Sequence, residues 1–451
     1  MTPTHEDWRR AATAALKGRP FEALIHHTVE DLAIQPLYGP GPDRAQPRPR
    51  PEAPGWDIRA PAARPGHVLE ALAGGATSVL LTAPIDLARA LDGVVLEAAT
   101  VALDAGFDGP AAGDELAALA KGSPQAKLAF HLDPLSAFAA RGSSPGPIAA
   151  HVAQAAEHAA GWARTYPDAS LFLASGRVVH EAGGSAAQEL GVMAAAAVAY
   201  ARALGGAGLA PKRAFAGIVL GLSADAEILT GMARIRAARE IWRRITAASQ
   251  AEAPAVIEAR SSGRMLTAMD PHTNLIRLTV AGFAAAAGGA DAVVLGGFTD
   301  ALGAPDARTR RLSRNIQLIL MHESGLGHVI DPAAGAWAIE ALTEDLAREG
   351  WGVFQAIEAQ GGLVAALSSG FIAASVEGVR MAREAAVADG TTTILGVNLH
   401  PDPDAGEVEV EEVEDRPEAE ARIEGADSVC PPLIATRVSA TAELVAAELE
   451  T

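Results

Sequence analysis

The chain has 451 residues, of which 49% are hydrophobic and 4% are aromatic. Its formal net charge of −19 argues against a general nucleic-acid binder and against a membrane-surface protein, because both of those partners are anionic. The single cysteine, Cys430, excludes a disulfide framework and a thiolate metal cluster. The sequence shows no run of about 18 apolar residues and no signal peptide, so we expect a cytoplasmic protein with no membrane partner.

Residues 1–65 are predicted to form an N-terminal region of their own. Apolar side chains alternate with charges over residues 1–20, which predicts a short amphipathic helix. Nine prolines interrupt residues 34–65, so this stretch is expected to be an extended arm. Leu37 and Trp56 on the arm suggest contact with its own domain or with a partner, and a flexible linker is the alternative.

Residues 66–400 alternate strand-like and helix-like segments. Apolar runs predict strands at 78–82, 127–132, 170–174, 215–220, 255–259, 292–295 and 392–397. Helical patterns lie at 84–91, 147–164, 187–204, 224–250, 273–287 and 308–322. Such alternation is typical of parallel strands joined by helical crossovers. It favours an α/β fold, an eight-stranded parallel β/α barrel of the TIM type, with one strand unseen between residues 320 and 380.

An open doubly wound sheet is the alternative fold. No Gly-x-Gly-x-x-Gly or Walker loop follows a predicted strand, which disfavours its dinucleotide-binding form. Residues 401–451 are predicted to form a short acidic C-terminal extension, because eight acidic side chains fall between residues 407 and 420. We expect a solvated edge strand or a disordered tail there, followed by a last helix at 441–450.

The loop after the predicted strand 170–174 carries the side chains best suited to chemistry. Arg177, His180, Glu181 and Ser185 all follow that strand before the next helix. Loops at the carboxyl ends of strands hold the catalytic residues of α/β barrels. His180 and Glu181 could form a general acid/base pair. We favour the simpler interpretation that His180 caps or orients the following helix.

Two further polar clusters have equally simple interpretations. The loop from Arg260 to Arg264 holds two cations and two hydroxyls, which suits a phosphate or a carboxylate but also an ordinary surface turn. Asp270 and Asn274 are good residues for capping the helix that follows. The histidines include no His-Glu-x-x-His pattern and have no cysteine partner, so no metal site is predicted.

Seven stretches resemble, in order and spacing, the methylmalonyl-CoA mutase family, and they span most of the chain. They are residues 91–96 (LDGVVL), 182–190 (AGGSAAQEL), 235–242 (IRAAREIW), 266–277 (LTAMDPHTNLIR), 314–320 (RNIQLIL), 331–335 (DPAAG) and 394–398 (ILGVN). The resemblance implies an eight-stranded barrel wrapped around the pantetheine arm of an acyl-CoA, usually followed by a flavodoxin-like cobalamin domain. It also implies a radical rearrangement of (R)-methylmalonyl-CoA to succinyl-CoA, started by homolysis of adenosylcobalamin.

The chain departs from that family where the family's reacting residues lie. Catalytic members carry Gly-Tyr-His-Ile-Arg-Glu-Ala-Gly on the third-strand loop, where residues 176–183 read Gly-Arg-Val-Val-His-Glu-Ala-Gly. Arg177 therefore stands in the place of the tyrosine, Val178 in that of the histidine, and His180 in that of the arginine. Val178 has no proton to donate and no hydrogen bond to offer a thioester carbonyl.

Other family features are also altered. The family's Gln-Thr-Ser-Gly-Trp reads Arg-Ser-Ser-Gly-Arg at 260–264, and its His-Thr-Asn is replaced by Phe-Thr-Asp at 298–300. The predicted strands carry apolar residues on both parities, as at 171–173 and 293–295. That pattern predicts a barrel interior filled with layered apolar side chains, with little room for a polar arm.

A cobalamin domain is not expected in this chain. Residues 401–451 are too few for one, and the cobalt-ligating Asp-x-His-x-x-Gly does not occur. His322 begins a His-x-x-Gly fragment, but Leu320 stands where the motif has Asp, and the fragment lies at the end of a predicted helix, so we reject it as a ligand.

These features most resemble the non-catalytic small subunits of heterodimeric mutases. We then expect no catalytic, cofactor-binding or metal-binding residue in this chain, and a degenerate site at Arg177, Val178 and His180. The resemblance implies a catalytic large subunit as partner, which would hold the adenosylcobalamin, and an N-terminal arm that wraps around it. The chain would be either a naturally shortened member of its group or one trimmed of a degenerate cobalamin domain.

Two alternatives stay open. The barrel could be catalytic and work with a separate cobalamin-binding subunit, in which case the site would consist of His180, Glu181, Arg260 and Arg264. The chain could also be a free-standing homodimeric barrel with an unrelated binding role.

Overall fold

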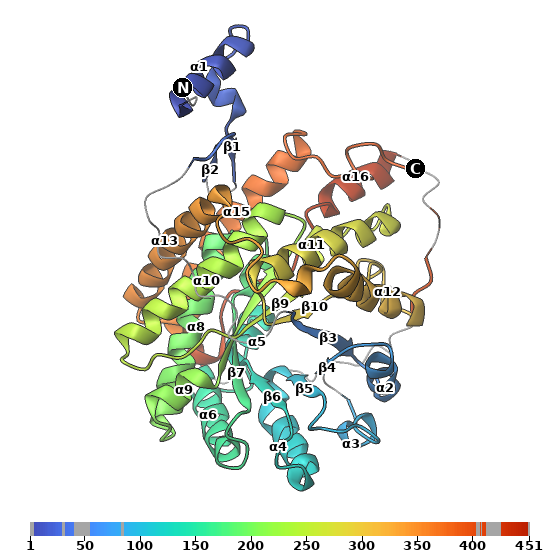
Figure 1. Ribbon diagram of the computed structural model, residues 1–451. Helices are drawn as coiled ribbons and strands as arrows, with labels where there is room; N and C mark the ends of the chain where they lie inside the picture. Colours follow the sequence, from blue (N-terminus) through green and yellow to red (C-terminus); the bar gives the residue numbers. More distant parts are fainter. Residues whose placement is uncertain are drawn as a thin grey trace.

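The computed structural model describes residues 4–28, 32–39, 55–82, 85–402, 406, 408–411 and 425–449. Eight parallel strands follow one another around a closed barrel, and the last pairs with the first (Figure 1). They are β3 (Asp57–Ala62), β4 (Ser78–Thr82), β5 (Thr100–Asp104), β6 (Leu128–Leu132), β7 (Ser170–Ser175), β8 (Ile218–Ala224), β9 (Ile257–Ser261) and β10 (Ala292–Val294). The predicted barrel is confirmed, and the open sheet is wrong.

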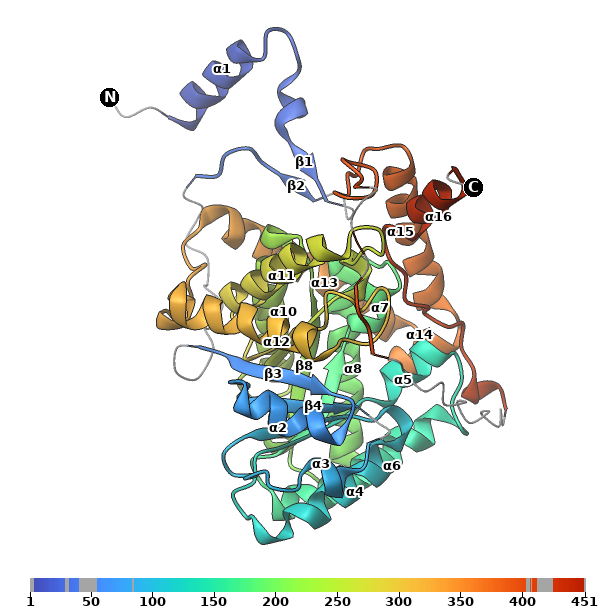
Figure 2. The same cartoon turned by 90° about the vertical axis from the view of Figure 1, so that its right-hand side faces the viewer.

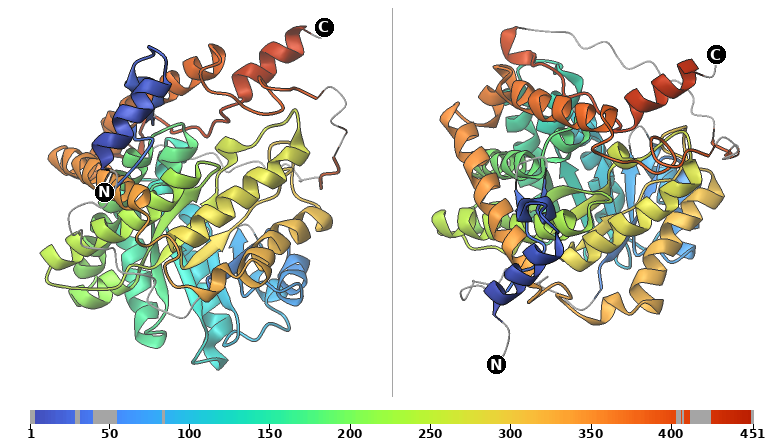
Figure 3. Two further views of the ribbon diagram at one scale, coloured as in Figure 1. Left: turned by 45° about the horizontal axis from the view of Figure 1, so that its top comes forward. Right: turned by 90° about the horizontal axis from the view of Figure 1, so that it is seen from above.

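Helices follow the strands and surround the barrel (Figure 3). They are α2 (Pro65–Ala73), α3 (Leu87–Ala90), α4 (Gly109–Leu119), α5 (Pro134–Arg141), α6 (Ile148–Thr165), α7 (Arg177–Glu181), α8 (Ala186–Gly206), α9 (Pro211–Ala216), α10 (Ile228–Ala248), α11 (Asn274–Gly288) and α12 (Ala307–Leu318). Three more come after the barrel: α13 (Trp337–Ala359), α14 (Leu363–Ser368) and α15 (Phe371–Ala388). The six predicted helices match α3, α6, α8, α10, α11 and α12, although α3 is only four residues long.

Six of the seven predicted strands are correct to within a few residues, and the one at 392–397 is wrong. Gly396 there has a φ of 79°, and the Asn398 side chain closes a turn by accepting from Ile394 N at 2.6 Å. The strand expected between residues 320 and 380 is also wrong, because α13, α14 and α15 occupy that range. The strands that the pattern did not reveal are β3 and β5.

Strand β3 lies inside the range that was expected to be an arm, so the barrel begins at Asp57 rather than after residue 65. Its Pro61 made the segment look unsuited to a sheet. The neighbouring β10 pairs only with Asp57 and Ile58. Pro61 therefore lies beyond that ladder, where its missing N–H costs no hydrogen bond.

The main core lies between the outer face of the barrel and the helices. Alternate strand residues such as Ile58, Val101 and Leu220 are buried there. Small residues let the helices approach closely: a Cβ on Gly191 of α8 would meet Val353 of α13 at 2.4 Å. The alanine- and glycine-rich composition is thus explained by helix layers packed in close contact.

The inner face of the barrel differs from its predicted apolar filling. Leu80, Ala102, Ala129 and Val294 form a small apolar cluster separate from the main core. Other inward-facing positions on several strands carry charge instead, and Arg260 on β9 pairs with Asp104 on β5. In the barrel order these two strands are separated by three strands in either direction, so their contact crosses the lumen.

The N-terminal helix α1 (His5–Ala15) and the two-stranded sheet of β1 (His26–His27) and β2 (Ala33–Ile34) project from the barrel (Figure 2). Trp56, which was assigned to the arm, is buried, and its Nε1 donates to Gln317 Oε1 of α12 at 3.0 Å. Trp56 thus contacts its own domain. Residues 40–54 of the expected arm lie outside the described residues.

The acidic extension contacts the barrel at Glu411, whose N donates to Ala304 O at 2.9 Å. Residues 412–424, which hold the rest of the acidic stretch, lie outside the described residues. The expected last helix is confirmed as α16 (Ala440–Leu449). Among the described residues, no helix combines the length and the apolar character that a bilayer crossing requires.

The core contact of Trp242 yields a stability prediction. This α10 side chain is buried, packs edge-on against Phe215, and donates from Nε1 to Ala253 O at 2.9 Å. We expect Trp242→Ala to lower the free energy of unfolding by about 3–5 kcal/mol, since it leaves a cavity and an unpaired carbonyl. Urea denaturation measures this loss. The control is Trp337→Ala: Trp337 is half exposed, so we expect its substitution to lower the free energy of unfolding by less than about 1 kcal/mol.

Candidate functional site

The predicted catalytic loop is largely a short helix. Residues 177–181 form α7, and the Ser185–Gln188 capping box then begins α8. Gly176 lies so close to α8 that a Cβ would be 2.0 Å from Glu189 O. A larger residue at 176 could not fit, so the glycine fixes the direction in which α7 leaves β7.

His180 is fully buried beneath the barrel mouth. Its Nδ1 lies 3.1 Å from Arg234 Nη1, which also contacts Glu189 Oε2 at 3.0 Å. Its Nε2 lies 3.5 Å from Asp225 Oδ2. Burial, and then the charges of Arg264 and Arg234, hold the pKa of His180 well below its usual value.

A neutral His180 therefore accepts from Arg234 through Nδ1 and turns its Nε2–H toward Asp225. The partners of its ring are the side chains of Glu189 on α8, Arg234 on α10 and Asp225, which directly follows β8. That His180 caps or orients α8 stays a prediction. An imidazole enclosed in this way cannot reach a substrate.

Arg264 belongs to the same buried cluster. Its Nη1 donates to His180 O at 3.0 Å and to Gly184 O at 2.8 Å, and its Nη2 contacts Asp225 Oδ2 at 3.3 Å. Burial and the charge of Arg383 lower the pKa of Arg264 to about 10. With these partners it ties the loops after β7, β8 and β9 together.

Arg177, Val178, Glu181 and Arg260 lie in a different place, around a cavity of about 440 Å³ at the carboxyl end of the barrel. The four residues proposed for a catalytic site are thus divided: Glu181 and Arg260 line this mouth cavity, while His180 and Arg264 do not. The remaining lining residues are Asp104, Gly106, His131, Asp133, Ser136, Ala137, Ala140, Leu173, Ser175 and Leu433 to Ala435.

Glu181 is held in place at the cavity wall. Its Oε2 accepts from Ser262 Oγ at 3.2 Å and from Arg264 N at 3.3 Å. Its Oε1 accepts from Arg177 Nη2 at 3.4 Å. The two charged side chains that face the cavity from α7 are therefore paired with each other.

A network of buried charges forms the floor of the mouth cavity. Glu258 of β9 pairs with Arg59 of β3 and, at 2.6 Å, with Arg260 Nε. Arg260 also pairs with Asp104, and Arg59 with Asp57 at 2.9 Å. Burial raises the pKa of Glu258, but the charges of Arg260, His131 and Arg59 outweigh it and hold the value well below the usual range.

His131 completes this lumen network and has an unusual backbone. Its Nδ1 lies 3.7 Å from Glu258 Oε2, and its φ is 44°, a left-handed conformation that a non-glycine residue adopts at a cost. The register between β6 and β7 shifts at this point. Burial lowers the pKa of His131 to about 4, against the opposing effect of Glu258.

Asp133, just beyond β6, adds a titratable group to the cavity wall. Its Oδ1 accepts from Ser136 N at 3.2 Å, as the cap of α5, and from the Tyr200 hydroxyl. Burial raises the pKa of Asp133 to about 7. Asp133 and the lumen network, apart from Arg260, were not predicted as parts of a site. The polar residues within residues 57–62, 127–132 and 255–259 were the available signal.

An extended segment, residues 428–439, crosses the barrel mouth, and we call it the strap. Its residues 433–435 form one wall of the mouth cavity. Four backbone N–H groups of the strap donate to loops around the rim: Cys430 to Gly142 O, Leu433 to Ala139 O, Thr436 to Glu181 O and Val438 to Arg264 O, at 2.8–3.0 Å. The mouth is therefore partly covered by the chain's own C-terminal region.

The residues of this chain do not fit a cobalamin. No strand follows β10 in the described part of the chain, so that part lacks the parallel sheet of a flavodoxin-like domain. His322 is exposed in the π-helical turn Ile319–Glu323. Met321 beside it contacts Gly55, which precedes β3, so His322 lies at the opposite end of the barrel from the mouth. Within the described ranges no cluster of three potential metal ligands occurs.

The comparisons with known proteins agree on one family. The family model of methylmalonyl-CoA mutase matches residues 71–439. The methylmalonyl-CoA mutase small subunit of Streptomyces virginiae is 37% identical over 437 residues, covering 88% of this chain and 70% of the relative. The probable small subunit of Mycobacterium tuberculosis is 34% identical, covering 87% and 69%. The methylmalonyl-CoA mutase of Escherichia coli K12 is 30% identical but covers only 53% and 34%.

The buried imidazole of His131 predicts a pH effect on stability. Its pKa is about 4 in the folded protein and 6.5 in an unfolded chain, so the unfolded state binds more protons between these values. Stability should fall as the pH decreases from 6.5 to 4, and His131→Asn should reduce that slope by about one proton. Urea unfolding at several pH values measures it. His322→Asn, which removes an exposed imidazole, should leave the slope unchanged; equal slopes for His131→Asn and the parent would contradict the assignment.

Proposed function

The chain belongs to the methylmalonyl-CoA mutase family, and from that premise we propose that it is the non-catalytic small subunit of an adenosylcobalamin-dependent methylmalonyl-CoA mutase. In this proposal a catalytic large subunit holds the cobalamin and isomerises methylmalonyl-CoA to succinyl-CoA. The present chain stabilises and positions that subunit. The observation that carries the proposal is the charged network across the barrel lumen.

The lumen network leaves no path for a pantetheine arm. The Arg260–Asp104 ion pair crosses the axis along which the family's acyl-CoA would lie, and Glu258 and Arg59 pair beside it. Removing one partner of a buried pair such as Arg59–Glu258 costs about 3–5 kcal/mol, because the other is left uncompensated. The interior is thus closed by ion pairs, where the sequence had suggested apolar layers.

The side chains at the mouth support the same proposal. Arg177 and Val178, which replace the family's tyrosine and histidine, do face the mouth cavity. Val178 offers neither a proton nor a hydrogen bond there. The one imidazole nearby on this helix, that of His180, is enclosed by Arg234, Glu189 and Asp225. The position where the family has its histidine therefore carries no acid.

The N-terminal region is the part best placed to hold a partner. It projects from the barrel (Figure 2), and Leu24 and Leu37 on it are exposed. Trp8 and Phe21 pack edge to face, with Arg9 over the Phe21 ring, so this region has a small cluster of its own. An obligate heterodimer would be expected to bury more than about 1,000 Å² in total.

The mouth cavity supports a second candidate, a catalytic barrel that works with a separate cobalamin-binding subunit. Its volume of about 440 Å³ and its Arg260 and Glu181 could hold a small acyl group. The two candidate functions predict different effects on turnover when residues at the mouth are substituted.

Turnover of the reconstituted complex separates these candidates. We expect this chain to form a 1:1 complex with a mutase large subunit in light scattering, and Arg177→Ala to leave kcat of that complex within about twofold, because Arg177 touches no substrate. Arg164→Ala, at an exposed position on α6, is the matched control. A kcat loss of about 100-fold for Arg177→Ala alone would support the catalytic candidate, and failure to form any complex would contradict the small-subunit role.

A further inference from the structure

The mouth cavity is lined by side chains with hydrogen-bonding groups that the folded chain leaves unused. Arg260 Nη2, Arg177 Nε and both ring nitrogens of His131 are buried and have no hydrogen-bond partner within the described part of the chain. All three side chains line the cavity of about 440 Å³. Buried polar groups nearly always have a partner, so unused groups around one cavity indicate a partner that this chain does not itself supply.

The backbone at His131 is a second, independent observation. Its φ of 44° is left-handed, and among the described strand residues it is the one non-glycine residue with a positive φ. Strained backbone of this kind occurs preferentially at ligand and catalytic sites, where the surrounding structure holds it in place. The strain thus lies at the same wall of the cavity as the unused ring nitrogens.

The charged side chains that line the cavity are already matched. Arg177 Nη2 lies 3.4 Å from Glu181 Oε1, and Arg260 pairs with Asp104 across the lumen. Two guanidinium groups therefore face two carboxylates. A charged ligand would enter this partly closed space without a counter-charge of its own, which is costly.

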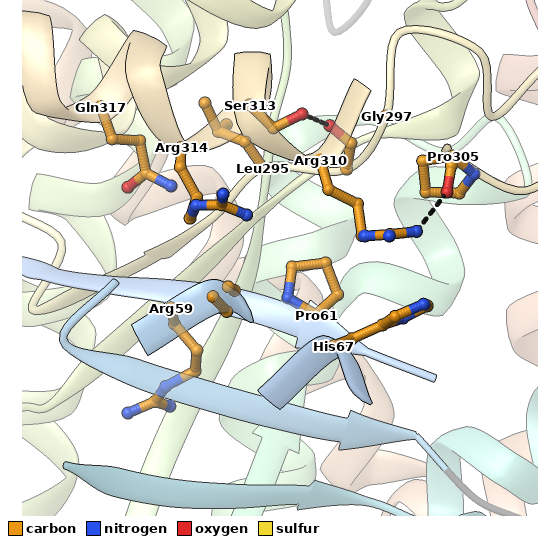
Figure 4. Close-up of a pocket in the computed structure, with 13 residues that line it drawn as sticks. Arg59, Pro61, His67, Leu295, Gly297, Pro305, Arg310, Ser313, Arg314 and Gln317 are labelled. Carbon is orange, nitrogen blue, oxygen red and sulfur yellow. Dashed lines mark hydrogen bonds between the residues drawn. The ribbon is translucent and has the colours of Figure 1, made fainter. Parts of the chain in front are cut away.

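The layer below the cavity is balanced in the same way. Arg59 pairs with Glu258 and with Asp57. Figure 4 shows the Arg59 side chain directed away from Arg310 and Arg314, which line a separate void of about 20 Å³, room for about one water molecule. The cations of that void are therefore not part of the charge balance at the mouth.

An uncharged ligand must both accept and donate hydrogen bonds here. Arg260 Nη2 and Arg177 Nε are donors, while a neutral His131 offers one donor and one acceptor. Asp133 adds a carboxyl group that is partly protonated near neutral pH, because burial raises its pKa to about 7. Hydroxyl groups meet all of these needs, since each one can accept and donate.

The apolar part of the lining favours an open-chain molecule over a ring. Leu173, Val178 and Leu433 line the cavity and suit contact with C–H groups. The described lining residues include no aromatic side chain, so a cyclic sugar would find no flat ring on which to stack.

We propose that the mouth cavity binds a small uncharged polyol, whose neighbouring hydroxyl groups are held by Arg260, Arg177 and His131. The strap, as one wall of the cavity, covers the ligand on its outer side. This proposal does not rest on the small-subunit role, because the isolated chain contains every residue of the site. It also differs from the catalytic candidate, which requires an acyl group in the same place.

A series of four-carbon probes tests the class of ligand on the full chain. Erythritol carries neighbouring hydroxyl groups, butane-1,4-diol has only terminal ones, and succinate and putrescine carry charges of opposite sign. In ligand-observed NMR titrations at constant ionic strength, we expect erythritol to bind 1:1 with a Kd of order millimolar, as suits so small a ligand. Butane-1,4-diol should bind at least about fivefold more weakly, because it leaves donors of the site unpaired. Succinate and putrescine should bind no more tightly than butane-1,4-diol.

Two variants locate the binding in the cavity. Ala140→Leu on α5 places a larger side chain at an exposed lining position and should abolish erythritol binding. Arg177→Gln should weaken it at least about fivefold, because a donor is lost. Arg164→Gln, at an exposed position on α6, is the matched control and should bind as the parent does, with the thermal midpoint as the check on folding in each variant.

Several results would overturn the proposal. Erythritol may show no saturable binding to the parent chain, which means that water alone fills the cavity. Equal binding of erythritol and butane-1,4-diol, tighter binding of succinate or putrescine, or erythritol binding that Ala140→Leu or Arg177→Gln leaves unchanged would also contradict it. None of these results bears on complex formation with a large subunit, so the proposed function is tested separately.

Discussion

The ion pair between Arg260 and Asp104 joins opposite sides of the barrel, and the site depends on it. With Glu258, Arg59 and His131 it forms a charged layer across the lumen, above the small apolar cluster of Leu80, Ala102, Ala129 and Val294. Arg59, Glu258 and Arg260 are buried, and each of these charges would be costly alone. Their mutual pairing offsets that cost, and the Arg260–Asp104 pair places the network across the barrel axis.

The polar residues near the mouth of the barrel form two groups, an enclosed cluster and the lining of the mouth cavity. Below the mouth, His180, Arg264 and Arg234 form a second enclosed cluster with Asp225 and Glu189, which joins α7 and α8 to the loops after β8 and β9. Above it, the mouth cavity keeps Arg177, Val178 and Glu181 near solvent, with the strap as one wall. In the proposed function, such a barrel serves as a rigid scaffold for a partner subunit.

Much of the barrel could be predicted from sequence, because six of its strands are short apolar runs between helical patterns. β3 escaped detection because Asp57, Arg59 and Pro61 look unlike a buried strand, although two of them bear charges that meet partners inside the barrel. The network that these polar residues form is the part of the site that could not be predicted from the sequence. Charges on strands far apart in the chain reveal a network only when the closed barrel brings Arg260 to Asp104 and His131 to Glu258.

Arg177 and Val178, the proposed degenerate positions, line the mouth cavity, because the segment after a barrel strand lies at that end. The proposed set of His180, Glu181, Arg260 and Arg264 is divided between the mouth cavity and the buried cluster, because successive residues on a helix, such as His180 and Glu181, point to different sides. His180 turns into the protein and Arg177 toward the cavity. When residues 177–181 are taken for a loop, this division cannot be predicted. When they are taken for a helix, the helical spacing predicts it.

Equilibrium binding of succinyl-CoA to the isolated chain tests the central claim most directly, because it asks whether the lumen admits a pantetheine arm. With the axis closed by Arg59, Glu258, Arg260 and Asp104, calorimetry should detect no saturable binding at millimolar ligand. A 1:1 complex of micromolar affinity, with the pantetheine arm lying along the barrel axis, would contradict the account.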